Sequence, residues 1–102
     1  QMAATPEALA QTVEIWAAAV ARVEAAEGPE SARLLLPVLK VAEARRQAGE
    51  TSTAAKLFTR LMMLAEVHTN PSAQGQAVLG MAQCAAAMRE WGAAEAAAAQ
   101  LV

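Results

Sequence analysis

An all-α fold is the expectation from this sequence, and three features of the chain predict it. Alanine fills 29 of the 102 positions, whereas Tyr and Asp are absent and Phe occurs once. Residues that favour helices therefore dominate, and residues that favour strands are scarce. Apolar residues recur at intervals of three and four, which is the period of an amphipathic helix. Gly and Pro interrupt this pattern near 28–29, 49–50, 70–71 and 90–92, which divides a single domain into five expected helices.

The first helix is expected over residues 6–27. Thr5 precedes Pro6, and this pair favours a helix start because a threonine hydroxyl caps free backbone N–H groups, while proline has no N–H at the first helical position. Gly28 follows and ends the helix. The apolar stripe of this helix consists of Leu9, Val13, Trp16, Val20 and Val23.

The second helix is expected over residues 30–48, and Gly49 ends it. Pro37 lies inside this range. A proline there either bends the helix, because it removes one backbone hydrogen bond, or marks the true beginning of the helix. In the second case residues 29–36 form a looser lead-in. The residues expected to face the core are Leu34, Leu35, Val38, Val41 and Ala42.

A third helix is expected after Gly49. It begins at Thr51 or Ser52 and fades at the turn signal of residues 68–71. Its wide apolar stripe consists of Ala54, Leu57, Phe58, Leu61, Leu64 and Ala65. Phe58 is the only Phe, and we expect it to be buried between the second, third and fourth helices. His68 is expected to flank the helix end, where a cation suits the helix dipole.

A fourth helix is expected over residues 72–89, with Ser72 as its cap, and a fifth over residues 91–102. The stripe of the fourth helix consists of Val78, Met81, Ala82, Ala85 and Met88. Gly75 and Gly80 inside it indicate close packing or a bend. The fifth helix starts near Trp91, and no cap closes it. We therefore expect the chain to be a piece of a longer protein.

Two copies of a helix–turn–helix pattern follow one another in the second half of the chain. The first contains Gly49, Ala54 and Phe58 in the segment AGETSTAAKLF, and the second contains Trp91 and Ala94 in the segment MREWGAAEAAAA. With these residues the chain resembles the tetratricopeptide-repeat family, whose units are helical hairpins of about 34 residues.

The resemblance covers roughly residues 36–102 and implies a fold for them. Hairpins over residues 36–66 and 74–102 would stack into a tetratricopeptide-like superhelix, within one helical domain over residues 1–102. A closed five-helix bundle is the alternative, because helical periodicity alone produces similar apolar stripes.

Residues that carry chemistry are scarce in this chain. It has one His, one Cys and no Asp. Cys84 and His68 are the only candidate nucleophile and base, and Cys84 lies among alanines, which indicates a small core residue. No residues have the spacing of metal ligands, and no Gly-rich phosphate loop is present. We therefore expect a protein that is not an enzyme and has no catalytic, metal-binding or cofactor-binding residues.

Charge and hydropathy argue against two further classes of partner. The net charge is −2 at pH 7, which does not favour nucleic acid. No run reaches the roughly 18 uninterrupted apolar residues of a membrane span. The single Cys cannot form an internal disulfide, and no signal-peptide pattern opens the chain. Both observations favour a cytoplasmic location.

The resemblance implies a scaffold for protein–protein interaction. In this family the first helix of each hairpin lines a groove that binds a peptide or a helix of a partner. By helical spacing, the expected partner-binding residues are Leu36, Leu39, Glu43, Arg46, Gln76, Leu79 and Gln83. The apolar residues would supply affinity, and the polar ones would orient the ligand. If this groove exists, Leu39 and Leu79 should be more exposed than Val41 and Met81.

Two other functions stay open. The chain is alternatively a structural or oligomerisation domain, whose alanine-rich last helix packs on another copy or on the rest of a larger protein. A carrier of a small ligand among Leu, Met and Trp side chains is the remaining alternative. The sequence supports the carrier least, because no polar residues are placed to orient such a ligand.

Overall fold

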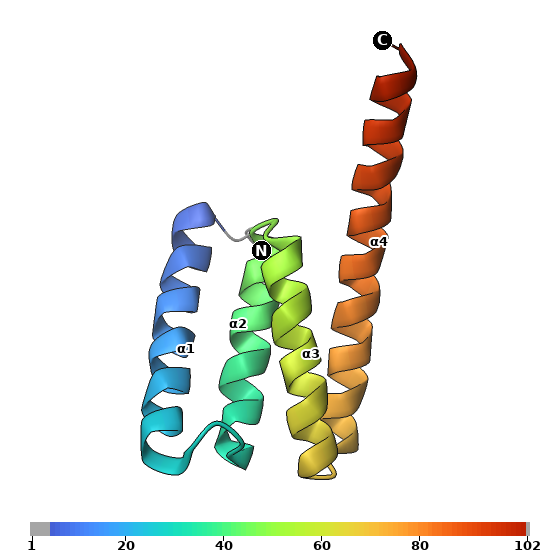
Figure 1. Ribbon diagram of the computed structural model, residues 1–102. Coiled ribbons are helices and arrows are strands. Elements are labelled where there is room, and N and C mark those ends of the chain that lie inside the picture. The colour runs from blue at the N-terminus through green and yellow to red at the C-terminus, as the bar shows by residue number, and fades with distance from the viewer. Residues whose placement is uncertain (1–4, 102) are drawn as a thin grey trace.

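The computed structural model describes the backbone of residues 5–101 and the side chains of residues 5–89. This part of the chain contains no strand, so the expected all-α class is confirmed. Its elements are α1 (Pro6–Glu27), the short 3₁₀ helix η1 (Ala32–Leu34), α2 (Leu35–Gln47), α3 (Thr51–Val67) and α4 (Pro71–Leu101). The helices lie side by side in chain order, and each runs antiparallel to the next (Figure 1). The backbone of α1 packs against α2 and η1, whereas α4 contacts both α3 and α2.

Three of the four expected interruptions are confirmed. The chain turns at Gly28 and Gly49, whose φ angles are 91° and 85°, a backbone conformation that glycine adopts without strain. The third turn, at Thr69 and Asn70, separates α3 from α4. The α2–α3 hairpin spans residues 35–67, one residue beyond each end of the range 36–66 that was expected for the first hairpin.

The prediction of an interruption near residues 90–92 is wrong. Helix α4 runs without a break from Pro71 to Leu101 and projects well beyond the ends of the other helices (Figure 1). Glycine inside a helix costs only about 1 kcal/mol relative to alanine, and Gly92 has alanines on its carboxyl side. The described residues 5–101 therefore contain four α-helices instead of five, and the range expected to hold the second hairpin, residues 74–102, forms a single helix as far as residue 101.

One of the two expected helix caps is confirmed and the other is wrong. The hydroxyl of Thr5 accepts a hydrogen bond from the Ala8 N–H at 3.1 Å, as expected for α1. Helix α4 is not capped by Ser72. Instead, Asn70 Oδ1 accepts a hydrogen bond from the Ala73 N–H at 3.0 Å. Proline suits the first helical position, so Pro71 places the cap on the residue before it.

Pro37 does not interrupt α2. It is the third residue of that helix and is buried. The first four N–H groups of a helix have no partner within the helix, so Pro37 removes no hydrogen bond. Of the two possibilities that the sequence left open, the structure is nearer to the later helix start, since α2 begins at Leu35, two residues before Pro37, after a lead-in that contains η1.

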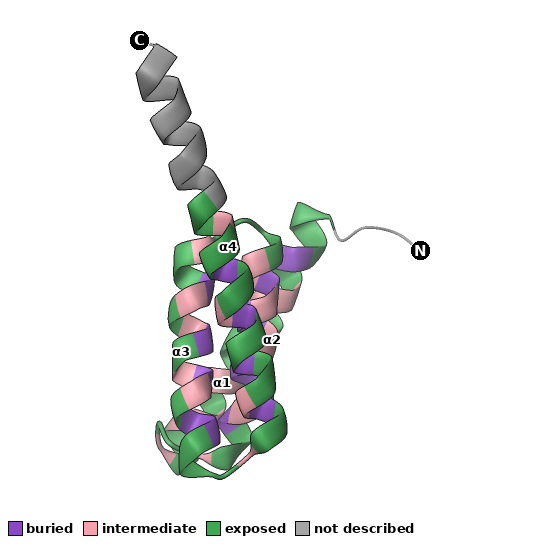
Figure 2. Cartoon of the chain, turned by 90° about the vertical axis from the view of Figure 1, so that its right-hand side faces the viewer, coloured by how far each residue is buried: buried purple, intermediate pink, exposed green. Residues whose placement is uncertain are grey.

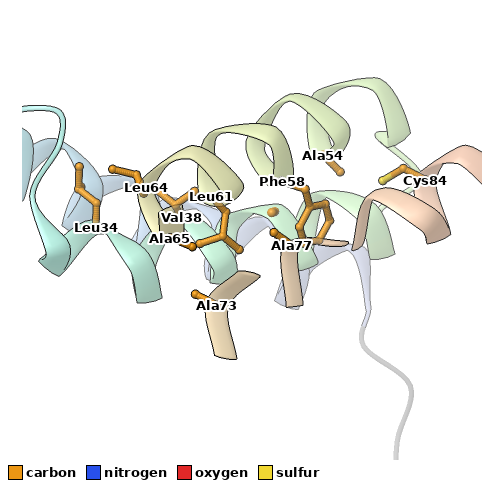
Figure 3. Packing of buried hydrophobic residues seen from close by; sticks show 11 residues of the cluster. Leu34, Val38, Ala54, Phe58, Leu61, Leu64, Ala65, Ala73, Ala77 and Cys84 are labelled. Atoms are coloured by element: carbon orange, nitrogen blue, oxygen red, sulfur yellow. The ribbon is translucent and has the colours of Figure 1, made fainter. Parts of the chain in front are cut away.

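The core lies between α2, α3 and α4, and Figure 3 shows its buried side chains. Phe58 is 1% exposed, so its expected burial is confirmed. Gly80 of α4 lies so close to the Phe58 ring that a Cβ atom at this glycine would overlap the ring carbons. The buried cluster consists of Leu34, Val38, Ala42, Ala54, Phe58, Leu61, Leu64, Ala65, Ala73, Ala77 and Cys84.

The residues of α4 that were expected to face the core are, with one exception, not the ones that do. The side of α4 that faces the core carries small residues, namely Ala73, Ala77, Gly80 and Cys84. Of the expected stripe only Met81 is partly buried, and the exposed members are Val78, Ala82, Ala85 and Met88. The spacing of the larger apolar residues pointed to the wrong side, because the Phe58 ring fills the space between α3 and α4 and leaves room only for small residues.

Candidate protein-binding face

The predicted partner-binding residues of α2 lie on one side of that helix. Leu36 is 52% exposed, and Leu39, Glu43 and Arg46 are half-buried. Their spacing of three, four and three residues places them one above the other along the helix. Leu39 also packs against the core cluster, so its side chain is shared between the core and the surface.

The predicted residues of α4 are all exposed. Gln76, Leu79 and Gln83 lie along one side of this helix, and Leu79 is 59% exposed. Because α4 contacts α2 as well as α3, the two sets of predicted residues belong to neighbouring helices. Within each helix the expected order of exposure is confirmed, since Leu39 is half-buried and Val41 buried, while Leu79 is exposed and Met81 half-buried.

Arg46 lies near the contact between α2 and α4. Burial raises the pKa of the Cys84 thiol on α4, and the Arg46 guanidinium on α2 opposes this rise by stabilising the thiolate. Arg46 therefore lies close enough to α4 for its charge to act there. Its Nε atom is buried without a hydrogen-bond partner, while the rest of the side chain is partly exposed.

Two hollows lie along the contact between α1 and α2, and Glu43 of the predicted partner-binding set lines one of them. The larger has a volume of about 410 Å³ and is lined by residues that include Leu9, Val13 and Arg45. In this hollow Arg45 Nη1 pairs with Glu50 Oε1 at 2.9 Å. The smaller, of about 340 Å³, is lined by both apolar and charged side chains, among them Lys40 and Glu43. Neither brings together a nucleophile and a base.

Cys84 and His68 lie far apart in the structure. Cys84 is buried beside α3, whereas His68 is exposed at the end of α3, where its Nε2–H donates to the Glu30 carbonyl at 2.6 Å. The position of His68 at the helix end is as expected. From the start of α4 to Cys84 the helix rises by about 20 Å. Among residues 5–89 no three His, Cys, Asp or Glu side chains are grouped so that they could hold a metal ion.

Sequence reasoning missed one surface feature of α4. Val78 is 53% exposed beside Leu79, and Ala82, Ala85 and Ala86 are exposed along the same helix. The signal was present in the sequence, because residues 67–88 contain no Asp, Glu, Lys or Arg. Solvent-facing sides of helices usually carry charged residues, so this uncharged surface is unusual for an exposed helix.

Within the described part of the chain, no helix has the length and apolarity needed to cross a membrane. No family model matches the chain, and the comparisons with curated proteins and with solved structures found no match.

Proposed function

We propose that this chain is a non-catalytic protein-interaction module that binds a peptide or a helix of a partner protein on the face formed by α2 and α4. The observation that carries this proposal is the exposure of Leu36 and Leu79 on neighbouring helices, at 52% and 59%. Large apolar side chains exposed on neighbouring helices can form part of a binding surface. They are accompanied by polar residues that can hydrogen-bond a ligand backbone, namely Glu43, Arg46, Gln76 and Gln83.

We also propose that helices α2, α3 and α4 are arranged as in a tetratricopeptide-repeat superhelix. Three features support it: the α2–α3 hairpin, the antiparallel placement of α4 against α3, and the contact between α2 and α4. In such an arrangement α2 and α4 are equivalent first helices and present their exposed sides in the same direction. A bound helix would lie across both, with its apolar anchors on the leucines.

The test is a selection from a phage-displayed random peptide library on the wild-type chain, followed by binding measurements on variants. We expect enriched peptides that carry apolar residues at helical spacing. Leu79→Glu should abolish their binding, because it places a charge among the apolar contacts. The matched control is Ala18→Glu, which introduces the same side chain at an exposed position of α1 and should leave binding unchanged.

Circular dichroism and thermal unfolding of both variants separate binding from folding. Leu79 is exposed, so Leu79→Glu should fold like the wild type. The proposal fails if the library yields no peptide that binds the wild-type chain, or if Leu79→Glu binds the selected peptides as well as Ala18→Glu does. Unfolding by both Leu39→Glu and Leu79→Glu would also contradict it and would favour a closed bundle, in which both leucines are core residues.

A further inference from the structure

Arg46 is a half-buried cation in the face formed by α2 and α4, which we call the α2–α4 face. Two other arginines of the described side chains are half-buried in the same way. Both of them are paired, Arg45 with Glu50 and Arg60 with Glu24. By contrast, no ion pair joins Arg46 to another residue among the described side chains, and its Nε atom has no hydrogen-bond partner. The charge of Arg46 is therefore not compensated by a contact within this part of the chain.

The charges near Arg46 leave the α2–α4 face with an excess of positive charge. On α2, Glu43 lies three residues from both Lys40 and Arg46. Its carboxylate is a neighbour of both cations on the helix surface and can balance only one of them. On α4, no charged residue occurs between Glu66 and Arg89. Figure 2 views the molecule from the side of α4 and shows the described part of this helix largely as exposed, so α4 presents an accessible surface without a carboxylate.

Arg46 lies beyond the apolar residues of the α2–α4 face. α2 and α4 run in the same direction, because each helix is antiparallel to the next (Figure 1). On α2, Arg46 follows Leu39 by seven residues, which is about 10 Å along the helix. On α4, the charge of Arg46 acts at Cys84, which follows Leu79 by five residues, or about 8 Å. The face therefore has an apolar end and a cationic end.

A partner that covers Arg46 must compensate the charge of its guanidinium group. Removing a cation from water without a counter-charge costs free energy. A carboxylate matches a guanidinium in charge and in shape, because it accepts two parallel hydrogen bonds from it. The other two half-buried arginines of the described part are compensated by this same chemistry, since both pair with Glu.

We propose that the partner segment bound on the α2–α4 face carries Asp or Glu, whose side-chain carboxylate pairs with Arg46. This inference rests on the function proposed above, since it names the chemistry of the partner of the same face. The carboxylate is expected roughly 8–10 Å from the residues that contact Leu39 and Leu79, which is about five to seven residues along a bound helix. An acidic residue at one end of the apolar contacts also fixes the direction in which the partner lies on the face.

The first experiment compares peptide selections on two proteins. A phage-displayed random library is selected on the wild-type chain and on Arg46→Gln, which removes the charge. We expect the wild-type peptides to carry Asp or Glu in addition to apolar residues, and the Arg46→Gln peptides to show no such enrichment over the unselected library. Arg22→Gln is the matched control, because Arg22 is exposed on α1 and its loss should leave the enrichment unchanged. Circular dichroism shows whether each variant is folded.

A double-mutant cycle then assigns the contact to one pair of groups. The dissociation constant of a selected peptide is measured by fluorescence anisotropy, with the C-terminus of the peptide amidated. Replacing the acidic residue of the peptide by its amide should raise the dissociation constant on the wild-type chain about tenfold, because a charged hydrogen-bonded pair is lost. On Arg46→Gln the same replacement should change the dissociation constant little, because the partner of the carboxylate is already gone.

Failure of this proposal and failure of the peptide-binding function give different results. Selected peptides without Asp or Glu, or an amide replacement that has the same effect on the wild-type chain and on Arg46→Gln, would overturn the pairing while the face still binds peptides. A peptide that binds only with a free C-terminus would overturn it as well, since the ligand group would then be the terminal carboxylate. If no peptide binds the wild-type chain, the proposed function fails and this proposal fails with it. The amide replacement is made in the peptide, so an unchanged dissociation constant on the wild-type chain overturns the pairing even if Arg46→Gln does not fold.

Discussion

At Gly80 the helix α4 comes so close to the Phe58 ring that no side chain fits between them. Alanine favours a helix over glycine by about 1 kcal/mol, so propensity alone predicts that Gly80→Ala stabilises the protein. The structure predicts the opposite, because the added methyl group must displace a buried ring in a packed core, at a cost of about 1–3 kcal/mol. We expect Gly80→Ala to lower the melting temperature in thermal unfolding followed by circular dichroism.

Gly75 provides the matched control on the same helix. A Cβ atom at this position meets nothing within 4 Å, so Gly75→Ala should raise the free energy of unfolding by about 0.5–1 kcal/mol. The two substitutions are chemically identical and differ only in their surroundings. If both variants melt at a higher temperature than the wild type, the close contact between Gly80 and Phe58 does not exist in solution.

Local hydrogen bonds fix where some elements begin, and the start of α4 is the clearest example. Asn70 Oδ1 accepts the Ala73 N–H at 3.0 Å, which satisfies one of the free donors at the helix start. Asn70→Ala should therefore lower the free energy of unfolding by about 1 kcal/mol, measured by urea denaturation. Ser72→Ala is the matched control and should change it little, because Ser72 is exposed within the first turn. Equal losses in the two variants would contradict this assignment of the cap.

The elements also show what the sequence predicts well and what it does not. Gly28, Gly49 and Pro71 produce strong local signals, so three turns were predictable, and the apolar stripe of α3 predicted the burial of Phe58. The direction in which α4 faces was not, because its core side consists of small residues selected by the Phe58 ring on another helix. Hydrophobic periodicity gives weight to large side chains, and on α4 two of these, Val78 and Leu79, are on the surface. The exposure of Leu36 and Leu79 was expected from the resemblance to the tetratricopeptide-repeat family, with helical spacing used only to place the residues on the helices.

Over the whole molecule, burial is unevenly distributed among the helices. α2 and α3 each contribute five buried residues, whereas α1 has 22 residues and only Leu9 is buried. Besides its contact with α2 and η1, α1 is linked to α3 by the ion pair between Glu24 and Arg60, at 2.6 Å. Both side chains of this pair are about one-third exposed, and such pairs contribute at most about 1 kcal/mol. α1 is therefore the least firmly attached of the first three helices.

This distribution predicts that α1 opens before the rest of the molecule unfolds. A single helix is marginally stable in water, so α1 should unfold when it detaches, while α2 and α3 keep their shared core. In native-state hydrogen exchange we expect the protection factors of the amides in α1 to be lower than those in α2 and α3 by about tenfold or more. Glu24→Gln should reduce the protection of α1 further and leave that of α3 unchanged, because the substitution removes the charge that holds α1 to Arg60. Equal protection of α1, α2 and α3 would instead show that the three helices unfold as one cooperative unit.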